Sequence, residues 1–175
     1  MIILKNERDI EAMRVSGQIA SEVLNLVGEW IRPGVTTREI DEHAAALIRE
    51  RGAKSAFLGY RKYPGNLCIS VNDEVVHGLP TDRKVQFGDI ISLDVGVIFR
   101  GYIGDNAKTV AVGGCDLLAQ KLMEVTERAL YEGIAAAVPG NRVVDISRAI
   151  QKFVENNGFS VVREFVGHGV GRSMH

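Results

Sequence analysis

Two aspartates stand in apolar, strand-like surroundings, where carboxylates are uncommon. Asp94 lies within the strictly alternating run Ile91–Phe99, although Asp is disfavoured in strands. Asp105 lies within a second strand-like run, residues 102–112. A carboxylate in such surroundings needs a partner, and two carboxylates can share one or two metal ions. The alternative is that both aspartates are hydrated on the open face of an antiparallel sheet.

A tight turn between the two runs would bring both carboxylates to one face. Residues 100–101, Arg-Gly, suit a two-residue hairpin loop, which sets Gly96 opposite Asp105. Asp94 then becomes a diagonal neighbour of Asp105, at roughly 7–8 Å along the backbone. At that spacing the two side chains can hold a cation between them. Gly96 and Gly104 beside them would let backbone and substrate approach closely.

The four histidines differ in their surroundings. His43 is expected to be a half-exposed residue of a helix, and His77 to lie in a loop or at a strand end. His168 stands among glycines in GHGVG, and His175 follows seven residues later. A histidine in such a turn can be purely structural. Together with the aspartates, however, imidazoles favour a first-row divalent ion such as Mn, Fe, Co or Zn, and hydrolysis is the natural chemistry.

Composition and absent motifs exclude several other classes. The 175 residues are 46% hydrophobic and 25% charged with a net charge of −1, which is typical of one soluble globular domain. This near-neutral charge argues against nucleic acid as a partner. The sequence has no export signal and no apolar run near the roughly 18 residues of a membrane helix. Two cysteines without CxxC spacing suit the reducing cytoplasm. Motifs of dinucleotide, P-loop, zincin and serine hydrolase sites are absent.

An internal repeat organises the chain. The periodicity predicts a helix over residues 9–30, then Pro-Gly, then a helix that begins at the Thr36 capping box and ends at Gly52. The same unit recurs 106 residues later, with helices over 117–137 and 143–156 and a final Gly158. Strands predicted at 67–71, 91–99 and 102–112 complete the first unit as an antiparallel sheet.

The repeat also predicts what should follow the second helix pair. The sheet region of the first unit, residues 70–112, should have a counterpart at 176–218, so we interpret the chain as a fragment of a longer protein. An exposed apolar surface is expected where the missing strands would pack.

Three segments resemble the single-domain bacterial methionine aminopeptidases. They are AFLGYRKYPGNLCISVNDEVVHGLP (56–80), GDIISLDVGVIFRGYIGDNAKTVAVG (88–113) and FVGHGVGRSMH (165–175). The resemblance implies the pita-bread α+β fold over residues 1–175, with a first half of about 1–112 and an incomplete second half of about 113–175. It implies a cytoplasmic metalloaminopeptidase, expected to be a monomer, that removes N-terminal methionine from peptides or nascent proteins.

The resemblance also implies roles for individual residues. Asp94, Asp105 and His168 would bind a centre of two divalent ions, from among Co, Mn, Fe and Zn. His77 and His175 would contact the peptide and stabilise the tetrahedral intermediate. The family's methionine pocket falls on five residues: Tyr60, Tyr63, Cys68, Met174 and Phe57.

The resemblance is incomplete at the metal site. The family completes that site with two glutamates that would lie downstream, so we expect weak or no activity and loose metal binding from this chain alone. The alternatives are an Xaa-Pro type peptidase on the same fold, a non-catalytic pita-bread module that binds peptides or proteins, and a truncated product that acts only in interactions.

Overall fold

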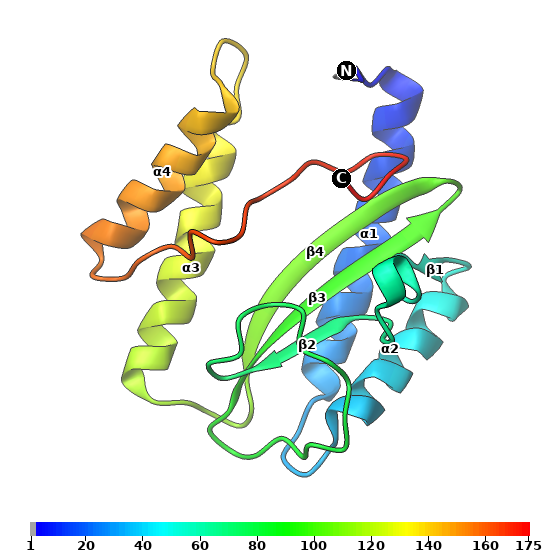
Figure 1. Cartoon of the computed structure of the whole chain (residues 1–175), viewed down its shortest axis with the longest axis vertical. Coiled ribbons are helices and arrows are strands. Elements are labelled where there is room, and N and C mark those ends of the chain that lie inside the picture. Colours follow the sequence, from blue (N-terminus) through cyan, green and yellow to red (C-terminus); the bar gives the residue numbers. More distant parts are fainter. Residues whose placement is uncertain (1–2) are drawn as a thin grey trace. The chain divides into compact units, whose positions relative to one another are not determined.

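The computed structural model describes residues 3–175, which form two compact units (Figure 1). The first contains residues 3–115 together with His168–His175, and the second contains Asp116–Gly167. All the predicted site residues therefore lie in the first unit, including those of the last eight positions of the chain.

Two helices open the first unit where the sequence predicts them. α1 spans Glu7–Trp30 and α2 spans Thr37–Glu50. The capping box at α2 is confirmed, because Thr36 accepts a hydrogen bond from the Glu39 amide while the Glu39 side chain accepts one from Thr36. Gly52 follows with φ of 67°, the left-handed conformation that suits a residue just past a helix end.

An antiparallel sheet follows, with β3 (Ile90–Phe99) at its centre. β3 pairs along its whole length with β4 (Tyr102–Ala111). Its other edge pairs with β1 (Lys54–Ser55) and β2 (Cys68–Val71). The three strands predicted from the sequence are confirmed to within one residue at each end. The two-residue β1 and the single turn η1 (Tyr60–Lys62) were not predicted.

One face of this sheet packs against α1 and α2 (Figure 1). Leu93 and Val95 of β3 are fully buried in the same core cluster as Val23 of α1 and Ile40 of α2. A slip of the strand by one residue would turn these apolar side chains to the opposite face. The helix-covered core therefore fixes which residues β3 presents on its other face.

The turn between β3 and β4 has the predicted register. Gly96 lies opposite Asp105, so Asp94 and Asp105 are diagonal neighbours on the face away from the helices. Arg100 and Gly101 have φ values of 50° and 81°, and two positive φ values are what a type I′ hairpin turn requires.

The role predicted for Gly104 is wrong. A methyl group at Gly104 would stand 2.1 Å from the backbone oxygen of Ser16, so this glycine makes room for α1 on the helix side of the sheet and not for a substrate. Gly96 does lie on the aspartate face, where a methyl group would stand 2.4 Å from the Phe57 ring. A glycine in a strand indicates a close approach but does not identify what approaches.

The second unit repeats the helix pair. α3 spans Leu117–Ala136 and α4 spans Val143–Asn156, so α4 has the 14-residue length of α2 and begins 106 residues after it. The glycines of the two Pro-Gly turns, Gly34 and Gly140, have φ values of 95° and 94°. The duplicated helical unit is thereby confirmed. Within residues 3–175, every helix is too short or too polar to cross a lipid bilayer.

Large apolar side chains of the second unit are exposed. On α3, Leu122, Leu130 and Ile134 are 38%, 55% and 57% exposed. Through the 106-residue offset, Leu122 and Leu130 correspond to Ser16 and Leu24 of α1, which are buried. These exposed apolar side chains lie on α3, two of them at positions whose counterparts on α1 lie in the interior of the first unit. That missing strands would pack on them stays a prediction.

Candidate metal centre

Asp94 carries a partly buried carboxylate that lies beside the carboxylate of Asp105. Burial, and then the adjoining Asp105 carboxylate, raise the pKa of Asp94 to about 7. Asp94 Oδ1 is buried without a hydrogen-bond partner among the described residues. A buried carboxylate oxygen that lacks a donor is costly, and a cation shared with Asp105 would relieve both this cost and the repulsion of the pair.

His168 lies at the edge of this pair. Its Nε2 is 3.8 Å from Asp105 Oδ2, and its side chain is 33% exposed. Across residues 3–175, no three His, Cys, Asp or Glu side chains are already gathered in a metal-binding arrangement. The arrangement is therefore two carboxylates with an imidazole beside one of them.

His175 and Tyr60 extend the contacts outward from His168. The rings of His168 and His175 lie 4.3 Å apart between centroids. The Tyr60 hydroxyl lies 3.0 Å from His175 Nδ1, and the two rings are stacked. A continuous path of neighbouring groups thus runs from the aspartates through two imidazoles to a phenol.

An apolar cluster lies beside the aspartates on the same face of the sheet. Cys68 is the direct partner of Asp94 in the pairing of β2 with β3. Phe57, Cys68 and Met174 are buried in one cluster, and Tyr63 packs against it. The structure therefore brings together four of the five residues for which a methionine pocket was predicted, and Tyr60 lies at His175.

Tyr63 and Cys68 are neutral in this cluster. Burial raises the pKa of Cys68 to about 11 and raises that of Tyr63 as well. The Tyr63 hydroxyl donates to the Gly78 carbonyl at 2.6 Å, with the Leu67 carbonyl at 3.1 Å. A thiol with so high a pKa is not a nucleophile at neutral pH, so Cys68 contributes packing surface and not reactivity.

His77 lies on the loop between β2 and β3, as expected, with a left-handed φ of 58°. It lines a cavity of about 370 Å³ together with Thr37 of α2, strand residues Ile69 and Val71, and further loop residues. None of the other predicted site residues lines this cavity. The following residue, Gly78, is the one whose carbonyl accepts the hydrogen bond of Tyr63.

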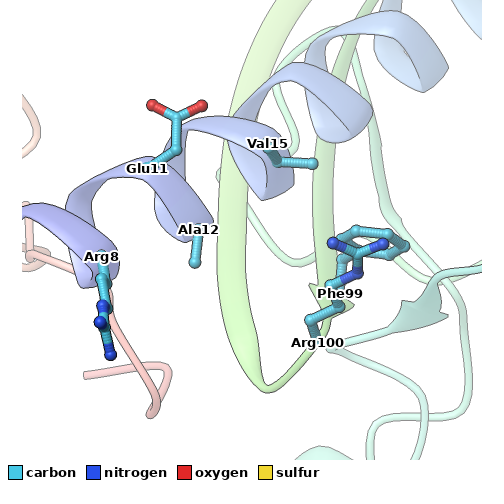
Figure 2. A pocket seen from close by; sticks show the side chains of 6 residues that line it. All are labelled: Arg8, Glu11, Ala12, Val15, Phe99 and Arg100. Atoms are coloured by element: carbon cyan, nitrogen blue, oxygen red, sulfur yellow. The ribbon is translucent and has the colours of Figure 1, made fainter.

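A second cavity, of about 320 Å³, lies where the first turns of α1 meet the β3–β4 turn (Figure 2). Ala12, Val15 and Phe99 line it together with charged residues of the same two elements: Arg8, Glu11 and Arg100. Figure 2 shows Glu11 directed away from Phe99 and Arg100. No predicted site residue lines this cavity, so it is separate from the aspartate face.

Arg172 was missed by the sequence reasoning. It lies between His168 and His175, and its guanidinium is over the Tyr102 ring, 4.3 Å from the centroid. The only signal in the sequence is an arginine inside the glycine-rich segment, which gives no indication of the aromatic ring it meets.

Residues 11–175 match the sequence profile of metallopeptidase family M24. This chain belongs to that family. It is 49% identical over its whole length to the methionine aminopeptidase of Clostridium perfringens and 47% identical to methionine aminopeptidase 1 of Bacillus subtilis, covering 70% and 71% of those proteins. The predicted family resemblance is confirmed.

Solved structures confirm the fold class. The M24 chain superimposes on methionine aminopeptidase from Rickettsia prowazekii with a TM-score of 0.98 at 36% identity, covering all of this chain and 71% of the other. For the Thermotoga maritima enzyme the TM-score is 0.96 at 41% identity, again with 71% of that chain covered. Prolidase from Pyrococcus furiosus, at 21% identity with a TM-score of 0.84 and half of its chain covered, shares the pita-bread fold.

Membership of a metallopeptidase family implies divalent metal ions, and the aspartate face fits them. The donors there are two carboxylates with an imidazole at hand, which are ligands that first-row divalent ions accept. The unpartnered Asp94 Oδ1 and the mutual repulsion of the pair are features that a cation would resolve.

Proposed function

We propose that this M24 chain carries the methionine-binding pocket and part of the metal centre of an aminopeptidase that removes N-terminal methionine from peptides and nascent proteins. One observation carries the proposal: Asp94 and Cys68 are paired across β2 and β3, so the acidic pair directly adjoins a buried cluster of aromatic and sulfur-containing side chains. The substrate class also follows from the methionine aminopeptidases that the chain resembles.

Asp94, Asp105 and His168 would hold the metal ions, two of them in our proposal, with Co, Mn, Fe and Zn as candidates. Bound divalent ions would lower the pKa of a water molecule and polarise the scissile carbonyl. Asp94 and Asp105 supply negative charge from adjacent strands, so the rigid β3–β4 hairpin sets their spacing. His168 comes from the C-terminal segment, which is neither helix nor strand.

His175 and His77 would contact the peptide. When the Tyr60 hydroxyl donates to His175 Nδ1, 3.0 Å away, it orients the ring and the proton of the neutral imidazole lies on Nε2. Nε2 of His175 can then donate a hydrogen bond to the oxygen on which negative charge develops. His77 would reach the peptide from the loop after β2, whose position depends on the bond between Tyr63 and Gly78.

The pocket would select methionine by packing. Phe57, Tyr63, Met174 and Cys68 offer aromatic and sulfur surface, and a thioether makes favourable contacts with ring edges, worth about 0.3–1.5 kcal/mol each. Because the Tyr63 and Cys68 side chains are neutral, they do not oppose entry of an uncharged side chain. An acidic side chain at the peptide N-terminus would lose its hydration there without gaining a partner.

We also propose that protein outside this chain completes the metal centre. The described residues do not gather three ligands, and the relatives are longer, since this chain covers about 70% of them. Weak or absent turnover and loose metal binding are therefore expected from the chain alone. A monomer in the cytoplasm, where both cysteines stay reduced, is the setting we propose.

The test combines a calorimetric titration with Co²⁺ or Mn²⁺ and a peptidase assay. Substrates would be a Met-Ala peptide and a peptide with proline in second position, which separates methionine removal from Xaa-Pro cleavage. The chain extended by the C-terminal part of a relative should bind metal at least about tenfold more tightly and cleave the Met-Ala peptide. Full turnover by the chain alone would contradict the ligand assignment. Preference for the proline peptide would favour the Xaa-Pro alternative.

A further inference from the structure

The segment that carries both His168 and His175 has no helix or strand of its own. A backbone hydrogen bond ties it to the sheet, from the Ile103 amide to the Gly171 carbonyl at 2.8 Å. Val170 and Met174 pack into the apolar cluster beside the aspartates. These contacts hold the backbone at one point and two apolar side chains. The directions of the His168 and His175 imidazoles therefore depend on the remaining contacts of the segment.

Arg172 is the charged group that fixes it. Its guanidinium lies over the Tyr102 ring at 4.3 Å, and its Nη2 donates a hydrogen bond to the Tyr102 hydroxyl. The same nitrogen is 3.9 Å from Asp9 Oδ1. Arg172 is thus held by a ring at the start of β4 and by a carboxylate in the first turn of α1.

Asp9 is itself held at two points. Its Oδ2 accepts the Asn6 amide as part of the capping box of α1, and its Oδ1 accepts the Tyr102 hydroxyl at 2.5 Å. The Tyr102 and Arg172 contacts and the helix cap each favour the charged carboxylate, and the pKa of Asp9 is accordingly lowered. The three residues Asp9, Tyr102 and Arg172, which we call the clamp, join α1, β4 and the C-terminal segment.

We propose that the clamp positions His168 and His175 over the aspartate pair. Arg172 lies four residues after His168 and three before His175, and Tyr102 lies three residues before Asp105 on β4. A group held between these two places controls the distance between the imidazoles and the carboxylates. That the clamp serves metal and peptide binding rests on the proposed function. The positions of the two imidazoles can be measured in the metal-free chain.

The geometry of the clamp matters more than its charge. The Arg172 side chain is 70% exposed, so its ion pair with Asp9 contributes little by itself. A planar guanidinium that lies on a ring and also donates to that ring's hydroxyl is constrained in both direction and distance. A lysine at this position would keep the charge but lose the plane, and it should only partly replace the arginine.

The test uses NMR of the Cε1–H groups of the four histidines in the metal-free chain. Arg172→Gln should shift or broaden the His168 and His175 resonances and leave those of His43 and His77 in place. The matched control is Arg32→Gln, since Arg32 also lies over an aromatic ring, that of Trp30, at 4.9 Å. His43 stacks on the same Trp30 ring, so the control should move only His43.

A second variant separates positioning from folding. Tyr102→Phe keeps the ring and removes the hydroxyl, so it should move the same two histidine resonances by a smaller amount at an unchanged unfolding temperature. Arg172→Gln should weaken Co²⁺ binding about tenfold, and Arg172→Lys should recover part of that loss. His168 and His175 resonances unmoved in Arg172→Gln, or all four moved together, would overturn the proposal. Absence of Co²⁺ binding by the unaltered chain would count against the proposed function alone.

Discussion

The Phe57 ring lies directly over Gly96, on the face of the sheet that carries Asp94 and Asp105. A methyl group on Gly96 would stand 2.4 Å from Cε1 of that ring. Gly96 lies opposite Asp105 and two residues after Asp94, so it lets an aromatic side chain of the apolar cluster pack beside both aspartates.

Gly96→Ala should destabilise the chain by about 1–3 kcal/mol, because the Phe57 ring must leave its position and the cluster must repack. The measurement is urea-induced unfolding followed by circular dichroism. The same substitution in a Phe57→Ala background should cost markedly less, since the clash is then removed. Equal costs in the two backgrounds would show that the ring is not what Gly96 accommodates.

A larger effect is expected at Gly104, because a methyl group there would meet backbone atoms of α1 and not a side chain. Gly104→Ala should cost more than about 3 kcal/mol, since a methyl 2.1 Å from the Ser16 carbonyl would push α1 off the sheet. The matched control is Gly17→Ala on α1 itself, where a methyl group meets nothing within 4 Å. It should stabilise the chain by about 0.5–1 kcal/mol through helix propensity. Thermal unfolding of both variants checks the pair, and similar midpoints would contradict this account.

Features encoded by local chemistry could be predicted from the sequence. The Arg100-Gly101 turn fixes the β3–β4 register, which in turn sets Gly96 opposite Asp105, so one dipeptide was enough to predict that the aspartates share a face. The helix pairs follow from capping residues and Pro-Gly turns, whose 106-residue offset the structure reproduces.

Features that depend on distant partners could not be predicted. Gly104 accommodates a helix 88 positions earlier in the chain, and nothing in its neighbours distinguishes that from room for a substrate. Arg172 meets Tyr102 and Asp9 only through the fold. Likewise, local sequence predicts a loop at His77 but not the cavity that it lines.

The exposed face of α3 should bind apolar dyes. Leu130→Lys, at a side chain 55% exposed, should lower the fluorescence of bound 1-anilinonaphthalene-8-sulfonate and change the free energy of unfolding by no more than about 0.5 kcal/mol. Val125→Lys on the same helix is the contrast, because Val125 is only 6% exposed and a buried lysine should cost several kcal/mol. Unchanged dye fluorescence in Leu130→Lys would mean that α3 does not supply the apolar surface.

The acidic pair should make the metal-free chain less stable as the pH rises. The ordinary pKa of Asp94, 3.8, applies in the unfolded chain, whereas the folded chain retains the proton up to about 7. Between these values the folded state binds more protons than the unfolded state, so the free energy of unfolding should fall with increasing pH, by at most about 1.4 kcal/mol per pH unit.

Asp94→Asn should flatten this dependence, because the amide does not titrate. A divalent cation should reverse it, since the cation stabilises the ionised carboxylates that the folded chain otherwise disfavours. Urea unfolding at pH 5 and pH 8, with EDTA and then with excess Mn²⁺, measures all three effects. If the unaltered chain and Asp94→Asn had the same pH dependence in EDTA, the two carboxylates would not share one buried site.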